Sequence, residues 1–324
     1  MLSFCAIADD PFKMVPRNLQ FSNLTTENGL SSEFVHDVAQ DGMGYLWFAT
    51  QSGLNRFDGH QVQVYENVSS EPDSLSHSFV WSLYVDTRGT LWVGTERGVN
   101  QYVPETDQFD RQPWEGVDLS AYRIRKIIRD REGIFWLGTL GDGLLRVDPA
   151  TNEVEQFVHS TGDKSSLTND YIIALLEDSR DQLWIGTDGG GLVRFDETTG
   201  GFVTYRHDPN NPLTISDNRI RSIYEDRQGH IWIGTAQGGL NLFEPRNGRF
   251  TRFVTEPKGE YSLPAGQISA VFEDDRGTLW LGTENGLAEW RPAENGFVRY
   301  TSSAASRTSL ANTRLNACRV STSP

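Results

Sequence analysis

The stretch Leu91-Trp92-Val93-Gly94-Thr95 recurs along the chain in nearly the same form. In each copy an aliphatic or aromatic residue precedes a tryptophan, and an apolar residue, a small residue and a threonine follow it. The tryptophans of the other copies are Trp47, Trp136, Trp184, Trp232 and Trp280. Successive copies lie 45, 44, 48, 48 and 48 residues apart. That period matches one four-stranded blade of a β-propeller and is too short for an independent domain.

Turn residues recur with the same period. An aspartate stands six residues before each tryptophan, and a glycine stands three before it, except in the fourth copy, which has Asp181. An aspartate that closes an Asx-turn, followed by a residue that tolerates positive φ, suits a tight turn between two strands. Asp181 fits because aspartate enters the left-handed region more readily than most residues. A second glycine, six or seven residues after each tryptophan, predicts a second hairpin.

The repeats define the expected domain organisation. Six complete blades are expected at residues 31–67, 76–114, 120–158, 168–206, 216–254 and 266–300. A seventh blade begins at Ser309 and breaks off after Ala317, which we interpret as a truncated or frame-shifted coding sequence. We expect a strand at Leu19 to Leu24 to close the ring, since closure removes exposed strand edges. The prediction is an all-β propeller over residues 19–317, with an incomplete seventh blade closed by the N-terminal strand, and an aberrant or disordered tail at 318–324.

Composition excludes several classes of protein. The net charge of −15 argues against nucleic acid as a partner. No run of 18 apolar residues is present, so no membrane span is predicted. The two cysteines lie outside the repeats and are too few for a disulfide framework or a cysteine-based metal site. Residues 1–8, MLSFCAIA, resemble the end of a secretory signal peptide, and a disordered N-terminal tail is the alternative.

The repeated residues have structural explanations. Burying one indole removes roughly 150–250 Å² from water, which makes the repeated tryptophans packing residues between blades and not sugar-stacking residues. One aspartate per blade could suggest calcium, but turn chemistry explains it more simply. We therefore predict no metal site and no cofactor.

Function is sought where the copies differ. In a propeller the first strand of each blade lines the central channel, and side chains alternate along it. The first strand of each blade has one apolar anchor residue, and these anchors are Val35, Val80, Ile124, Ile172, Ile220, Ile268 and Leu315. The positions directly before and after the anchors bring together five arginines and five aromatic or histidine residues. These candidate ligand-binding residues are Phe34, His36, Phe79, Trp81, Arg123, Arg125, Tyr171, Arg219, Arg221 and Arg314.

Two interpretations of this group stay open. Guanidinium groups bind carboxylate or sulfate and aromatic faces stack on sugar rings, which predicts a pocket for an anionic or saccharide ligand. Alternatively, the arginines pair with acidic residues of neighbouring blades and seal the channel. No metal-ligand spacing, nucleophile motif or phosphate-binding loop is present, so no catalytic residue is predicted. A lyase in which Tyr171 acts with His36 or His77 remains an alternative.

The phrase Glu27-Asn28-Gly29-Leu30-Ser31-Ser32 and the run from Asp41 to Phe57, with its later copies, resemble the two-component regulator propeller repeat. The resemblance covers about residues 19–317. It implies the periplasmic input region of a bacterial membrane-bound sensor, whose output is a histidine kinase or a diguanylate cyclase. Members of the family often sense breakdown products of polysaccharides. The family has no shared catalytic residues to carry over.

The sequence therefore predicts a non-enzymatic, periplasmic ligand-binding sensor module of a two-component or cyclic-di-GMP receptor. Its expected partner is a small molecule or an oligosaccharide, with contact to a membrane only through a missing C-terminal region. Homodimer formation stays open. The alternatives are a propeller lyase acting on an acidic polysaccharide or a cyclic peptide, and a scaffold that binds another protein on its flat face.

Overall fold

A computed structural model describes residues 23–245, 247–255 and 262–301. These residues form six four-stranded antiparallel sheets, each built from consecutive strands in chain order. The first blade comprises β1 (Val35–Gln40), β2 (Leu46–Thr50), β3 (Gly53–Phe57) and β4 (Val62–Tyr65). The second comprises β5 (Val80–Val85), β6 (Leu91–Thr95), β7 (Gly98–Val103) and β8 (Gln108–Asp110). The third comprises β9 (Ile124–Arg129), β10 (Phe135–Thr139), β11 (Leu144–Asp148) and β12 (Glu153–Phe157).

The remaining blades repeat the same plan. The fourth comprises β13 (Ile172–Glu177), β14 (Leu183–Thr187), β15 (Leu192–Asp196) and β16 (Gly201–Tyr205). The fifth comprises β17 (Ile220–Glu225), β18 (Ile231–Thr235), β19 (Leu240–Glu244) and β20 (Arg249–Phe253). The sixth comprises β21 (Ile268–Glu273), β22 (Leu279–Thr283), β23 (Gly286–Arg291) and β24 (Gly296–Tyr300). Two short 3₁₀ helices, η1 (Thr26–Asn28) and η2 (Pro292–Glu294), complete the described elements.

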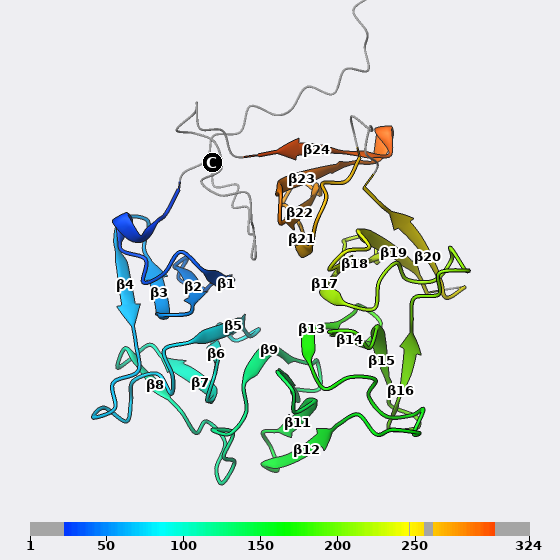
Figure 1. The fold of residues 1–324 in the computed structure, drawn as a ribbon. Helices are drawn as coiled ribbons and strands as arrows, with labels where there is room; N and C mark the ends of the chain where they lie inside the picture. Colours follow the sequence, from blue (N-terminus) through cyan, green and yellow to red (C-terminus); the bar gives the residue numbers. More distant parts are fainter. Residues whose placement is uncertain (1–22, 246, 256–261, 302–324) are drawn as a thin grey trace, which may run out of the picture.

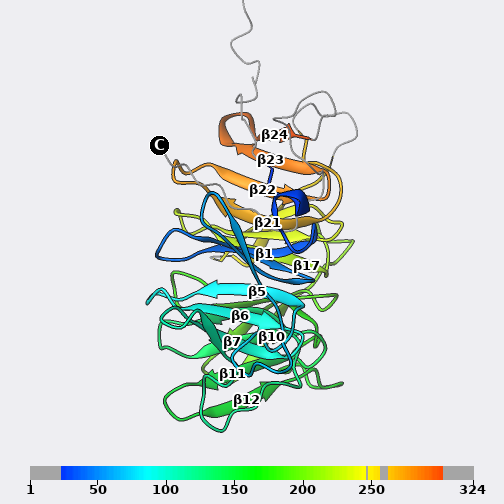
Figure 2. The same cartoon turned by 90° about the vertical axis from the view of Figure 1, so that its left-hand side faces the viewer.

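The blades are arranged around a common axis, with the first strand of each blade innermost (Figure 1). The first strands of successive blades contact each other, from β1 with β5 to β17 with β21. Figure 2 turns the ring edge-on and shows the sheets of the first two blades side by side. The expected β-propeller of four-stranded blades is therefore confirmed.

The turn between the first and second strands explains the fixed spacing of aspartate and tryptophan. In the fourth blade, Asp178 Oδ1 accepts the backbone N–H groups of Arg180 and Gln182, at 2.9 and 3.0 Å. Its Oδ2 accepts the indole N–H of Trp184 at 2.9 Å. The same indole bond occurs in all six blades. The predicted Asx-turn is confirmed, and the carboxylate has a second role that the turn argument missed. Asp181 has φ of 60°, as predicted.

Five of the repeated tryptophans contact a ring of the next blade, which confirms their predicted packing role, and Trp280 contacts Tyr300 of its own blade. All six are at most 6% exposed. Trp184 lies 5.1 Å from Phe243 of the fifth blade, measured between ring centroids. Trp136 lies 5.1 Å from Phe195 of the fourth blade in the same way. In the second to fifth blades the glycine two residues after the tryptophan lies against the anchor of the next blade: an added Cβ at Gly186 would be 2.6 Å from the Ile220 side chain. The first blade has Ala49 at this position.

Several predictions fall outside the described residues. These are the signal-peptide remnant at 1–8, most of the leading strand at 19–24, the start of the seventh blade, Arg314 and the tail at 318–324. Within the described ranges, no helix combines the length and the apolar character that crossing a bilayer requires.

Candidate functional site

The first strands share a local distortion at the candidate site. Each of them has an irregular register, a β-bulge, at the residue directly after its anchor. The bulged residues are His36, Trp81, Arg125, Ile173, Arg221 and Ser269. A bulge leaves the extra residue out of the ladder and re-aims its side chain. The residues directly before and after the anchors lie at one end of the ring, which we call the entry end.

At the entry end the first two blades form an aromatic group. His36 stacks on Phe79 with 5.0 Å between ring centroids, and Trp81 lies 4.8 Å from His36 and 4.4 Å from Phe79. The indole N–H of Trp81 donates to Glu96 Oε1 at 2.8 Å. On the third blade, the guanidinium carbon of Arg125 lies 5.8 Å from the Trp81 ring, which is within cation–π distance. Four of the predicted residues therefore form one continuous surface.

The electrostatics of this group are set by burial and by Arg125. Burial, followed by the positive charge of Arg125, lowers the pKa of His36 from 6.5 to about 4, although Asp37 opposes the shift. The imidazole is therefore neutral at physiological pH, and its buried Nε2 has no hydrogen-bond partner within the described chain. Burial also lowers the pKa of Arg125, with Arg221 adding to the effect, but a guanidinium stays protonated. The group presents aromatic faces beside a fixed positive charge.

Arg123 and Tyr171 form a second pair at the entry end. Arg123 donates to the carbonyl of Leu140, and both side chains flank Gly141. An added Cβ at Gly141 would lie 3.4 Å from the Arg123 guanidinium and 3.5 Å from the Tyr171 ring. Gly141 also has φ of +112°, so this turn favours glycine. Arg123 is exposed, and Tyr171 is 48% exposed, so both side chains remain accessible.

The remaining predicted residues are arranged differently. Arg221 pairs with Asp188 of the fourth blade at 2.9 Å and with Gln267 Oε1 of the sixth at 3.1 Å. It follows the alternative in which an arginine bridges neighbouring blades. Arg219 Nε lies 3.9 Å from Asp217 and its side chain is 42% exposed. Phe34 is 57% exposed and has no ring contact within the described chain.

Sequence reasoning missed an ion pair near the axis. Lys126 Nζ on β9 lies 3.1 Å from Asp37 Oδ2 on β1, and the same oxygen accepts the backbone N–H of Leu83 on β5. Through these contacts the pair links the first, second and third blades next to the aromatic group. Its signal was available, because both residues stand two positions after an anchor, where the other blades have serine or alanine.

The histidines of the lyase alternative lie apart from Tyr171 in the described residues. His77 Nδ1 accepts the backbone N–H of Phe79, and within the described chain no hydrogen bond joins Tyr171 to His36 or His77. The described residues also contain no cluster of three histidine, cysteine or acidic side chains placed to hold a metal ion.

Comparison with known proteins agrees with the repeat. The family model for the two component regulator propeller matches residues 74–97, 166–189, 214–237 and 262–285. The chain carries two-component regulator propeller repeats. The resemblance drawn from the sequence is thereby confirmed, and the matched segments fall in the second, fourth, fifth and sixth blades.

The relatives of the propeller include proteins of bacterial signalling systems. Histidine kinase P4 of Formosa agariphila is 39% identical over 75 residues, which are 23% of this chain and 5% of the kinase. The extracellular domain of a putative hybrid two component system from B. thetaiotaomicron is 26% identical, with a TM-score of 0.75, and the match covers 92% of this chain and 39% of that one. A second extracellular domain, from a putative one component system of B. thetaiotaomicron, is 21% identical with the same TM-score, covers 92% of this chain and 37% of its own, and shows the fold alone. The chain thus spans less than half the length of each of these relatives.

Proposed function

We propose that this propeller is the ligand-binding sensor module of a bacterial two-component receptor and that its entry end binds a saccharide with an anionic group. The observation that carries the proposal is the surface formed by His36, Phe79, Trp81 and Arg125 in a propeller with this repeat. Aromatic faces stack on sugar rings, and the guanidinium supplies the charge that a carboxylate or sulfate requires.

The positions of the accessible groups support an extended ligand. The aromatic group lies on the first two blades, Arg125 and Arg123 on the third, and Tyr171 on the fourth. Arg221 on the fifth blade is already paired with Asp188 and Gln267, so it contributes less to binding. We infer that the ligand lies across the first four blades, with its apolar ring faces on Trp81 and Phe79 and its anionic group beside Arg125 or Arg123.

We further propose a periplasmic location for this module. The structural relative with 26% identity is an extracellular domain of a two-component system. A receptor of that kind receives its ligand outside the cytoplasmic membrane. Signalling then requires the ligand to bind one receptor state more tightly than the other, because equal affinity shifts no equilibrium.

Calorimetric titration of the full chain tests the binding site. Oligosaccharides that contain uronic acid would be compared with neutral oligosaccharides of the same length. Arg125→Gln removes the charge and should weaken binding of the acidic series about tenfold or more, since a hydrogen bond to a charged group contributes about 1.5 kcal/mol or more. Trp81→Ala should weaken both series, because it removes the stacking surface.

A matched control is Arg249→Ala. Arg249 is exposed on the outer strand β20 and should leave binding unchanged. Equal binding of the acidic series by the Arg125 and Trp81 variants and the parent would remove the entry end as the site. Ultraviolet absorbance during incubation with uronic-acid polymers would detect the unsaturated product of a lyase, and its steady rise would favour an enzyme instead.

A further inference from the structure

The opposite end of the ring carries a second repeated contact. This end of the ring is formed by the six turns that begin at the repeated aspartates, and we call it the exit end. At three junctions between blades, the turn residue after the aspartate donates its backbone N–H to a glutamate that ends the first strand of the next blade. The pairs are Arg131 with Glu177 at 3.2 Å, Ser179 with Glu225 at 2.6 Å and Arg227 with Glu273 at 2.8 Å.

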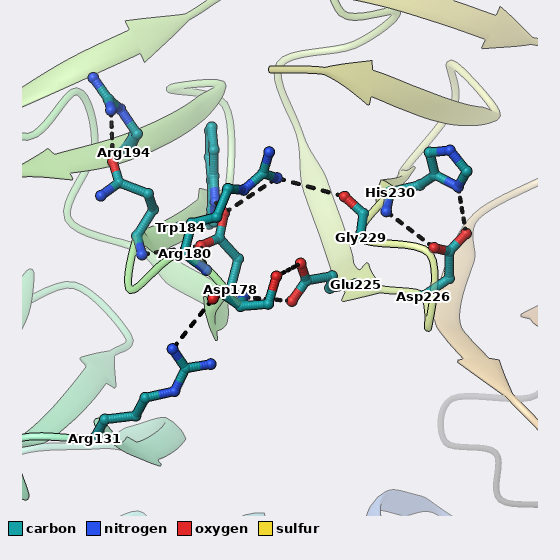
Figure 3. A network of polar contacts seen from close by, with 11 residues as sticks. Arg131, Asp178, Arg180, Trp184, Arg194, Glu225, Asp226, Gly229 and His230 are labelled. Carbon is teal, nitrogen blue, oxygen red and sulfur yellow. Dashed lines mark hydrogen bonds and ion pairs between the residues drawn. The ribbon is translucent and has the colours of Figure 1, made fainter. Parts of the chain in front are cut away.

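Figure 3 shows the contact at the junction of the fourth and fifth blades, where Glu225 reaches the turn that holds Asp178. Glu225 also accepts the hydroxyl of Ser179 at 2.6 Å. Arg131 approaches the same turn from the third blade and donates to the carbonyl of Ser179. The turn N–H at these junctions is thus a carboxylate-binding group, and the protein supplies the carboxylate.

The junction of the second and third blades has the donor without the carboxylate. Thr87 occupies the position of Ser179, and its backbone N–H and hydroxyl have no hydrogen bond within the described chain. Arg129 stands where the next three blades have glutamate. Its Nε donates to the carbonyl of Gly133, and its nearest acidic partner is Asp86, at 3.6 Å. A donor therefore faces a cation where the other junctions place an anion.

A pocket of about 680 Å³ lies at this junction. Thr87, Arg88, Arg129 and Arg131 line it together with the acidic residues Asp130, Glu132 and Glu177. Of the three arginines, Arg129 pairs with Asp86 and Arg131 with Asp181, so Arg88 is the cation that remains for a ligand. Arg88 is exposed, and its guanidinium has no hydrogen bond or ion pair within the described chain. The junction of the first and second blades also lacks the glutamate, but its corresponding residues are Gly42 and Val85, which bring no charge. Only the second and third blades combine an open turn N–H with unpaired positive charge in the described part of the ring.

We propose that this pocket binds a carboxylate group supplied from outside the ring. The carboxylate takes the place that Glu177, Glu225 and Glu273 occupy at the other junctions, accepting from Thr87 while Arg88 neutralises it. Its source is either a sugar acid or an acidic side chain of a protein segment. The site is separate from the entry end and does not rest on the function proposed there.

The test follows the Thr87 amide in ¹H–¹⁵N NMR spectra of the full chain. Sodium glucuronate is titrated against glucose as the uncharged control, and the blocked peptide Gly-Glu-Gly against Gly-Gln-Gly. The carboxylate probes should shift the Thr87 resonance in a saturable manner, and the uncharged probes should not. Tighter binding of glucuronate would identify a sugar acid as the source, and tighter binding of the peptide a protein segment.

Two variants make the test specific. Arg88→Ala removes an exposed, unbonded side chain and should weaken carboxylate binding about tenfold. Arg129→Glu rebuilds the contact of the other junctions, so it should abolish the response to added carboxylate and leave the Thr87 amide already shifted. Arg276→Ala, at the same turn position of the sixth blade, is the matched control and should change nothing.

The proposal is overturned if the Thr87 resonance does not move with either carboxylate, or moves equally with the uncharged probes. It is also overturned if Arg88→Ala and Arg129→Glu both bind like the parent. Should Arg129→Glu not fold, Arg88→Ala decides alone. Because the readout is the Thr87 amide, loss of binding at the entry end by Arg125→Gln should leave this response intact, which separates the two proposals.

Discussion

Replacing Asp178 tests why aspartate and tryptophan keep a fixed spacing. The carboxylate is 1% exposed and accepts three hydrogen bonds: two from the turn and one from the Trp184 indole. Each bond to a charged acceptor contributes about 1.5 kcal/mol, so Asp178→Ala should lower the free energy of unfolding by roughly 4 kcal/mol. Asp178→Asn keeps one acceptor oxygen and turns an amide toward the indole N–H or the turn, and should lower it by about 2 kcal/mol.

Urea unfolding followed by tryptophan fluorescence measures these losses. Asp58 provides the matched control, since it closes an exposed turn by accepting the N–H groups of His60 and Gln61 and has no indole partner. Asp58→Ala should therefore cost clearly less than Asp178→Ala. A double-mutant cycle with Trp184→Phe isolates the indole bond and should give a coupling energy of about 1.5 kcal/mol. A coupling energy near zero, or equal losses at Asp58 and Asp178, would refute the reasoning.

Three further outcomes are expected. The pKa of His36 is lowered in the folded protein, so on acidification the unfolded chain takes up a proton first. The free energy of unfolding should therefore fall as pH drops from about 6.5 to about 4. In urea titrations His36→Gln should reduce this fall by about 1–2 kcal/mol, a value that includes solvent screening. Gly234→Ala should lower the unfolding free energy by about 1–3 kcal/mol, because the new Cβ would lie 2.7 Å from the Ile268 carbonyl of the next blade. Gly42→Ala is the control and should be tolerated, since its Cβ would meet nothing within 4 Å. Thermal unfolding measures both variants. The Thr87 amide should exchange with solvent far faster than the Ser179 amide, which is bonded to Glu225, and equal protection by NMR would contradict the difference between the two junctions.

The sequence predicts the fold because the residues that build each blade are local and periodic. Trp184, Asp178 and Asp181 all act within one blade or on the blade beside it, so one copy explains the others. The double role of the aspartate was visible as a constant spacing of six residues. It was missed because the turn alone accounts for an aspartate at that position.

The candidate site was less predictable because its side chains choose partners across blades. Arg125 and Arg221 occupy the same position in their blades, yet Arg125 lies beside Trp81 while Arg221 pairs with Asp188 and Gln267. Nothing within either repeat distinguishes them. The difference depends on residues contributed by the neighbouring blades, at sequence separations of 33 to 46 residues.

The same reasoning explains where binding can evolve on such a ring. The tryptophan and its aspartate are the same in all six blades, and the residue two positions after the tryptophan is glycine in five blades and Ala49 in the first, because it lies close to the anchor of the next blade. Positions that face the axis or end a first strand hold the ring together only through an optional ion pair or hydrogen bond. At the junction of the second and third blades, Arg129 stands where other blades have glutamate, so one such hydrogen bond is missing. This junction is packed through Trp92, Trp114 and Phe135. A propeller can therefore acquire a charged site at a single junction without losing its shape. The rings of Trp92, Trp114 and Phe135 hold that junction, and the Arg129 guanidinium adds to their packing because it lies 5.3 Å from the centroid of the Phe135 ring.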